Sequence, residues 1–424
     1  MRTNFIFTDD PLSGERIYEY THSSGAKALA VKTETSAPSA AVSVPFSGGT
    51  SDISLEGFRY IPTFPGSAHF AEHMIFTGGR LDRFCAMGAD ANAETSMTGT
   101  TYYVTGGNEF IHAFGDLIGM VARPRFGEDE LEKERDIILR EKSDDDDVFT
   151  KGRNALTDLI FSKGSVRREI IGDKKSIKKM NSSLLRGIYR YAYRPSVTSL
   201  AAVSDVDFER IFDVVDASFL GMQPEAPPSF GIIKSERRDT RGAVKQVRSL
   251  KKSGFLFVGL APDLSPLSHD YAKKQVYSSM LESMIFDRTE YIGYSLLEKG
   301  RGFNGGFRSD AEIFGDDLIL TAGLSCEDRK GAAELFVSVF DSAKSMGAKN
   351  IFPHTEAKRR SLIADYISVF DSPSDLALTL SEYAARGARF TDVGRTLLEF
   401  DENDFLSFAD KVLSSAAVYA VYGD

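Results

Sequence analysis

The sequence predicts an α+β protein built from two homologous α/β domains, and three observations lead to this prediction. At 424 residues the chain is too long for one simple core. The stretch Glu72-His73-Met74-Ile75-Phe76 is echoed 210 residues later by Glu282-Ser283-Met284-Ile285-Phe286. The two halves also end in similar strand-like stretches, at residues 199–205 and 417–424. A repeat of this length indicates a duplicated unit.

A change in composition separates the two halves. Residues 221–242 contain QPEAPPSFG and KSERRDTRG, in which prolines, glycines and charges occur without apolar periodicity. We therefore expect one domain over residues 1–220, a linker over 221–242 and a second domain over 243–424.

Apolar runs predict the strands and helices of the first domain. Residues 16–35 and 39–46 are expected to be strands because they contain runs rich in Ala and Val. Residues 91–96 and 100–105 are expected to pair around the turn Thr98-Gly99. Residues 199–203 are expected to form a further strand. Helical patterns cover residues 109–121, 126–142, 152–161, 175–193 and 207–220.

The stretch His69-Phe70-Ala71-Glu72-His73 is the strongest functional signal. Start signals at residues 63–67 and a stop signal at Gly78-Gly79 predict a short helix around it. Residues i, i+3 and i+4 share one helix face, so His69, Glu72 and His73 are expected to point the same way.

That face has the chemistry of a zinc hydrolase. Two imidazoles one turn apart can bind one Zn²⁺, and a third protein ligand would leave a position for water. Glu72, beside the metal but not bound to it, could take the proton of that water. The order H-x-x-E-H is the inverzincin signature. The alternative is two ordinary histidines on an amphipathic helix.

A third ligand is expected on the helix over residues 126–143. Acidic residues at its start suit the positive end of the helix dipole. Glu134 and Glu141 lie seven residues apart, two turns along one face. One could bind the metal while the other orients a histidine. Spacing alone leaves open a solvated acidic face.

Four segments together resemble the pitrilysin family, whose members include mitochondrial processing peptidase and insulin-degrading enzyme. They are H-F-A-E-H-M-I-F-T-G, A-N-A-E-T-S, T-T-Y-Y and E-R-D-I-I-L-R-E. The resemblance implies one Zn²⁺ per chain held by His69, His73 and Glu141, with Glu72 as general base. It implies that Glu134 is a carboxylate behind the ligands.

The resemblance also implies a fold and a substrate. The fold would be similar to that of LuxS and mitochondrial processing peptidase, with mixed, mainly antiparallel sheets covered by helices. An extended peptide would lie along the edge strand that contains Asn92 and Ala93, so that backbone pairing binds it with little regard to side chains. In the second half Ser279 and Ser283 occupy the places of the two histidines, so zinc is expected in the first half only.

One departure from the family predicts a partner. Family members usually carry an arginine followed seven residues later by a tyrosine, and both contact the substrate. Leu297 and Asn304 stand at these places. We therefore expect a heterodimer whose homologous second subunit supplies the Arg/Tyr pair, with a homodimer as the other possibility.

Composition excludes several classes of function. A net charge of −10 and a pI of about 5.3 argue against nucleic acid as a partner. The sequence contains no apolar run of membrane-spanning length and begins without an apolar signal region, so we expect no membrane span and a cytoplasmic location. Cys85 and Cys326 give neither a metal motif nor a disulfide framework.

Two motifs are set aside. Residues 300–305 satisfy G-x-G-x-x-G, but a helical pattern precedes them and a strand-like stretch, residues 311–324, follows, the reverse of a dinucleotide site. An oxidoreductase is therefore a distant third hypothesis. The acidic run at residues 144–147 is expected to be a solvated loop.

The predicted function is a zinc-dependent endopeptidase acting on extended or unfolded peptides. The alternative is a non-catalytic peptide-binding or scaffold subunit of a larger assembly.

Overall fold

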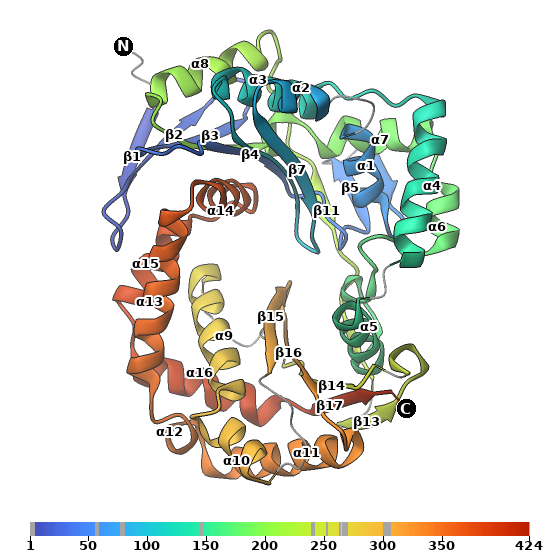
Figure 1. Ribbon diagram of the computed structural model, residues 1–424, viewed down its shortest axis with the longest axis vertical. Helices are drawn as coiled ribbons and strands as arrows, with labels where there is room; N and C mark the ends of the chain where they lie inside the picture. The colour runs from blue at the N-terminus through green and yellow to red at the C-terminus, as the bar shows by residue number, and fades with distance from the viewer. Residues whose placement is uncertain are drawn as a thin grey trace. The chain divides into compact units, whose positions relative to one another are not determined.

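The computed structural model describes residues 5–55, 59–76, 81–144, 147–238, 242–251, 253–262, 264, 270–299 and 307–423. The chain divides into two compact units (Figure 1). The first contains residues 1–144, 168–233 and 365–394, and the second contains residues 145–167, 234–364 and 395–424. The division of the sequence at residues 221–242 stays a prediction. The compact units do not follow it, because residues 145–167 belong to the second unit and residues 365–394 to the first.

A seven-stranded mixed sheet forms the centre of the first unit. Its order is β1-β2-β3-β10-β4-β8-β7, and β10 runs parallel to β3 while the other neighbouring pairs are antiparallel. The central strands β4 and β10 are buried along their whole length, as their Ala, Val and Ser side chains predict. The bounds are β1 Phe5–Asp9, β2 Arg16–Thr21, β3 Lys27–Lys32, β4 Ser39–Val44, β7 Ala89–Thr95, β8 Thr100–Gly106 and β10 Ser199–Ser204.

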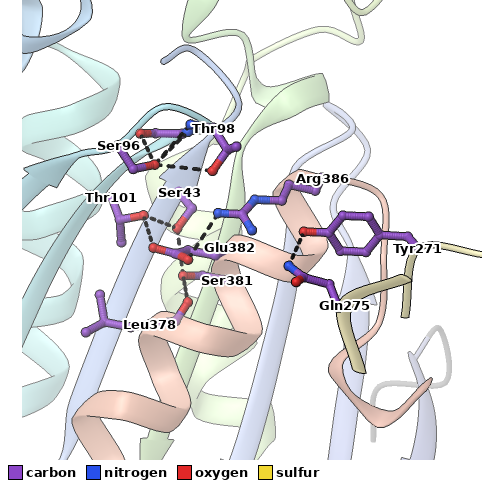
Figure 2. A network of polar contacts seen from close by, with 11 residues as sticks. Ser43, Ser96, Thr98, Thr101, Tyr271, Gln275, Leu378, Ser381, Glu382 and Arg386 are labelled. Atoms are coloured by element: carbon purple, nitrogen blue, oxygen red, sulfur yellow. Dashed lines mark hydrogen bonds and ion pairs between the residues drawn. The ribbon is translucent and has the colours of Figure 1, made fainter. Parts of the chain in front are cut away.

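Helices cover both faces of this sheet. Helices α3 (Phe110–Ala122) and α8 (Phe208–Ser218) lie on one face and α14 (Pro373–Ala385) on the other (Figure 1). Figure 2 shows how α14 is attached, with Ser381 Oγ 2.7 Å from Ser43 Oγ on β4 and Thr101 Oγ1 donating to Glu382 Oε1 at 3.3 Å. A segment from the end of the sequence therefore completes the first unit.

Shorter elements surround the predicted zinc helix. They are α1 Ser67–Ile75, α2 Leu81–Ala86, α4 Glu128–Asp144, α6 Lys174–Lys179, α7 Ser182–Ala192 and the small sheet β11-β5-β6, with β5 Asp52–Leu55, β6 Arg59–Pro62 and β11 Ser229–Gly231. The single helix expected over residues 175–193 is wrong. Asn181 divides it because its side chain accepts a hydrogen bond from the backbone N–H of Leu184 and so begins a new helix.

The predicted linker contains two short strands. Strand β11 pairs with β5, and β12 (Glu236–Arg237) pairs with β9 (Phe161–Lys163) in the second unit. Part of the range expected to be a linker therefore has regular structure. Strands of two or three residues carry too little periodicity to be predicted.

A five-stranded sheet forms the second unit, in the order β13-β17-β14-β16-β15. Strand β17 is parallel to β13, and the other pairs are antiparallel. This order and these directions equal those of β3-β10-β4-β8-β7 in the first unit. The expected strand over residues 311–324 is a hairpin that turns at Gly315. The bounds are β13 Ala243–Gln246, β14 Phe255–Leu260, β15 Arg308–Phe314, β16 Asp317–Ser325 and β17 Val418–Tyr422.

The helices of the second unit include α5 from the first half of the sequence. Helix α5 packs on β14, β16 and β17, and Gly152 lies directly against the ring of Phe257. Helix α5 is Val148–Ile160. The other helices of this unit are α9 Tyr271–Phe286, α10 Tyr291–Lys299, α11 Arg329–Met346, α12 Ala348–Ile351 and α16 Glu402–Ser415. Helices α13 (Thr355–Asp371) and α15 (Phe390–Leu398) belong partly to each unit. Short 3-10 turns occupy Ser165–Arg167, Pro195–Val197 and Arg248–Leu250.

Several predicted features are placed only in part. Some predicted features lie outside the described residues: residues 78–79, residues 145–146, and residues 300–305, which include Asn304. Asp147, the last residue of the acidic run, begins α5 by accepting hydrogen bonds from the backbone of Phe149 and Thr150. Among the described helices, none has the length and hydropathy needed to cross a membrane.

Gly66 fixes where α1 begins, and its replacement should destabilise the protein. Its φ is 86°, and a Cβ there would lie 2.6 Å from the carbonyl oxygen of Ile171. Gly66→Ala should lower the free energy of unfolding by about 2 kcal/mol or more, because both the backbone and the contact are strained. Urea denaturation measures this. The control is Gly119→Ala in α3, where an added Cβ would meet no atom within 4 Å outside the neighbouring backbone of its own helix. This substitution should be neutral or slightly stabilising. Equal stability of the two variants would refute the argument.

Candidate metal centre

Helix α1 presents one polar face because its other face is fixed in the core. Phe70 and Met74 are completely buried in the core of the first unit. His69, Glu72 and His73 are only partly buried. The roll of the helix therefore directs these three side chains away from the core and toward α4 and β7, which α1 contacts.

Helix α4 brings its carboxylates to the same place by the same means. Leu131 and Ile138 are fully buried, and Glu134 and Glu141 lie three residues after each of them. Residues three apart share a helix face, so the packed side of α4 also carries both glutamates. The Glu134 side chain is 11% exposed and that of Glu141 is 47% exposed.

Three side chains converge on one point. Nε2 of His69 lies 3.6 Å from Oε1 of Glu141, and Nε2 of His73 lies 3.4 Å from Oε2 of the same carboxylate. The three potential ligand atoms all lie within 4.8 Å of one another. Two imidazoles and one carboxylate form a donor set that catalytic zinc sites use. The residues present therefore fit a zinc ion.

Glu134 orients one of the imidazoles. Its Oε2 lies 3.0 Å from Nδ1 of His73, so that Nε2 of the same ring faces Glu141. Metal-binding histidines commonly donate their second N–H to a carboxylate in this way. Among the described residues, Nδ1 of His69 has no hydrogen-bond partner.

The charges of the centre are strongly coupled. Hydrogen bonds from His69 and His73 hold the pKa of the Glu141 carboxyl well below its usual range, against the opposing effect of burial. Burial lowers the pKa of His73, but its hydrogen bonds to Glu141 and Glu134 outweigh this and raise it overall. The lowered pKa keeps the Glu141 carboxylate ionised, which suits a ligand of a divalent cation.

Glu72 lies beside the donor set and outside it. Its Oε2 accepts a hydrogen bond of 2.6 Å from Oγ1 of Thr95 on β7. Sequence reasoning did not single out Thr95, although it belongs to the A-N-A-E-T-S segment that carries Asn92 and Ala93.

Strand β7 is the last strand in the described order of its sheet. Asn92 pairs with Tyr103 and Ala93 with Tyr102, both on β8. The structure thus brings together His69, His73, Glu134 and Glu141, with Glu72 beside them, and places Asn92 and Ala93 on an edge strand that α1 contacts. The roles assigned to these residues stay predictions.

A family comparison covers the same elements. The profile of the family "Insulinase (Peptidase family M16)" matches residues 59–174, a range that contains α1, β7 and α4. Over these residues the chain is similar to M16 peptidases. All the site residues predicted from the sequence lie within the matched range.

The chain is similar to curated proteins over different lengths. The chain is 26% identical over 351 residues to the uncharacterized zinc protease YmfH of Bacillus subtilis, covering 80% of each protein. It is 31% identical over 182 residues to the uncharacterized zinc protease Rv2782c of Mycobacterium tuberculosis, covering 39% of this chain and 41% of that protein. It is 28% identical over 185 residues to the mitochondrial-processing peptidase subunit beta of Lentinula edodes, covering 41% and 40%. The last two matches span about two fifths of the relatives' length.

Solved structures share the fold. An M16-like peptidase from Alicyclobacillus acidocaldarius superposes with a TM-score of 0.83 at 19% identity, covering 100% of both chains. Pitrilysin superposes with a TM-score of 0.71 at 14% identity, covering 99% of this chain and 47% of pitrilysin. The chain therefore corresponds in fold to about half of pitrilysin.

The geometry predicts different metal losses for the two glutamates. Glu141→Ala should purify with little or no zinc, because it removes a ligand. Glu134→Gln should still bind zinc, but with a Kd raised roughly 10- to 100-fold, because an orienting partner of His73 is weakened. Elemental analysis and chelator competition measure both. Asp136→Asn, an exposed residue of the same helix, is the control. Full zinc content in Glu141→Ala would contradict the assignment.

Proposed function

We propose that this chain is a zinc-dependent endopeptidase that cleaves extended or unfolded peptides. The convergence of His69, His73 and Glu141 within 4.8 Å, with Glu72 alongside, carries this proposal. These three ligands would hold one zinc ion per chain. The relatives named as zinc proteases support the same reaction class.

The chain's own residues have distinct tasks in this reaction. Zinc, when bound, supplies Lewis acidity that lowers the pKa of a water from about 15.7 toward 7 and polarises a carbonyl group. Glu72 takes the proton of the attacking water and later returns it to the leaving amine. Glu134 keeps the His73 ring turned toward the site throughout.

The substrate would bind by backbone pairing along β7. Asn92 and Ala93 lie in the middle of this strand, and Thr95 at its end contacts Glu72. A peptide added to a sheet edge is held mainly through its main chain, so many sequences can bind once they are extended.

We also propose that the two units descend from one duplicated α/β unit. The equal order and directions of the five strands in the two sheets support this. Helix α9 carries Glu282 with Ser279 and Ser283, where α1 carries Glu72 with His69 and His73. Hydroxyl groups are poor zinc ligands beside imidazole, so one copy retains the metal site.

A second subunit would complete the active form. Leu297, in α10, occupies the place at which the family usually carries the arginine of an Arg/Tyr pair. We propose a homologous subunit that supplies this pair in a heterodimer, with a homodimer as the alternative. The fold correspondence to about half of pitrilysin supports a second chain. Because Leu297 stands in place of this arginine, the second candidate function is a non-catalytic, peptide-holding subunit.

Glu72→Gln should separate metal binding from hydrolysis. The amide cannot accept the water's proton, so the variant should bind one zinc per chain and cleave unfolded peptides at least about 100-fold more slowly. Peptide cleavage and zinc content are measured on the same preparations. The control is Glu282→Gln, which changes the corresponding glutamate on α9 of the second unit. This variant should cleave peptides at the wild-type rate. Undiminished cleavage by Glu72→Gln would remove Glu72 as the base.

The partner proposal predicts weak activity of the isolated chain. Loss of a group that stabilises the oxyanion typically costs about 10²–10³ in rate. Adding a homologous subunit with an Arg/Tyr pair should raise cleavage by a factor of this order. Adding the same subunit with both residues replaced should not raise it. An isolated chain with a full rate and no increase on mixing would refute the need for a partner.

A further inference from the structure

Thr95 makes the one hydrogen bond that Glu72 receives among the described residues. The two side chains come from different elements, since Glu72 lies on α1 and Thr95 ends β7. Their oxygens are 2.6 Å apart, a distance typical of a hydroxyl that donates to a carboxylate. No part of the proposed reaction so far uses this contact.

Neighbouring contacts fix the direction of this hydrogen bond. Thr100, opposite Thr95 on β8, has its Oγ1 2.8 Å from the carbonyl oxygen of Phe46. A carbonyl can only accept, so the single hydroxyl proton of Thr100 is given to Phe46. The hydroxyls of Thr95 and Thr100 are 3.4 Å apart, and Thr100 has no proton left for Thr95. Thr95 therefore gives its own proton to the much closer Glu72.

This assignment distinguishes the two oxygens of the Glu72 carboxylate. Oε2 is held by Thr95, so Oε1 is the oxygen left for the proton of the attacking water. A glutamate side chain otherwise rotates about several bonds, and fixing it costs conformational entropy. A carboxylate already held in place meets less of this cost when the water reacts.

We propose that Thr95 is a positioning residue, which holds Oε2 of Glu72 so that Oε1 faces the water. The inference deepens the proposed peptidase function and rests on it. Because Thr95 is two residues beyond Ala93 on β7, the strand that would align the peptide also aligns the base. The substrate and the base are thereby both positioned by β7. The residue opposite Thr95 in the sheet, Thr100, is fully buried.

Two substitutions at Thr95 test the proposal. Thr95→Val keeps the β-branched shape but removes the hydroxyl, and Thr95→Ser keeps the hydroxyl. In Thr95→Val, kcat should fall roughly 10- to 100-fold while KM changes by less than about twofold, because a hydrogen bond to a charged group is lost. Thr95→Ser should stay within about threefold of wild type, and zinc content should be unchanged in both. The control Thr101→Val removes a hydroxyl from β8 that contacts Ser43 and Glu382 and does not touch Glu72.

Crystal structures of the same variants give a readout that does not depend on activity. The Glu72 carboxylate should leave its place beside β7 in Thr95→Val and keep it in Thr95→Ser. The inference is overturned if the carboxylate stays in place in Thr95→Val, or if kcat is unchanged there. It is also overturned if Thr95→Ser fails to restore kcat, or if Thr101→Val lowers kcat equally, since either result indicates a general structural role. A wild-type chain that does not cleave peptides even with a partner would refute the proposed function instead, and the crystal structures would still decide the role of Thr95.

Discussion

The centre depends on one carboxylate held against two imidazoles that stand one turn apart. Glu141 can meet His69 and His73 together only if α1 and α4 have a fixed separation and a fixed roll. Buried apolar residues set both, because Phe70 and Met74 anchor one helix and Leu131 and Ile138 the other. The polar geometry is thus a consequence of core packing, and Glu134 adds the last constraint by orienting the His73 ring.

Local chemistry could be predicted from the sequence, and contacts between elements could not. The face shared by His69, Glu72 and His73 follows from helix geometry within five residues. The spacing of Glu134 and Glu141 shows that both can face α1, but not which one meets the Nε2 atoms. That choice required the family resemblance, and the structure places Glu141 there. Thr95 was missed because its contact with Glu72 joins a strand to a helix across 23 residues.

The α+β class and most elements were also predictable, because long apolar patterns dictate them. The break at Asn181 was missed since a single capping side chain interrupts an otherwise continuous helical pattern. Strands such as β11 are too short to show alternation. The partners of α5 and α14 were beyond prediction, because amphipathicity shows that a helix has a buried face and not which sheet covers it. Only specific fits, such as Gly152 against Phe257, reveal the pairing.

The exchange of α5 and α14 between the sequence halves has a consequence for biosynthesis. Ser43 on β4 meets Ser381 on α14 across 338 residues, so this face of the first sheet gains its cover only after residues 373–385 have left the ribosome. Until then, the nascent chain would expose a central, largely apolar strand surface to solvent. Such long-range closure slows folding and favours aggregation of incomplete chains. Each unit takes segments from both halves of the sequence, so neither half by itself contains a finished unit.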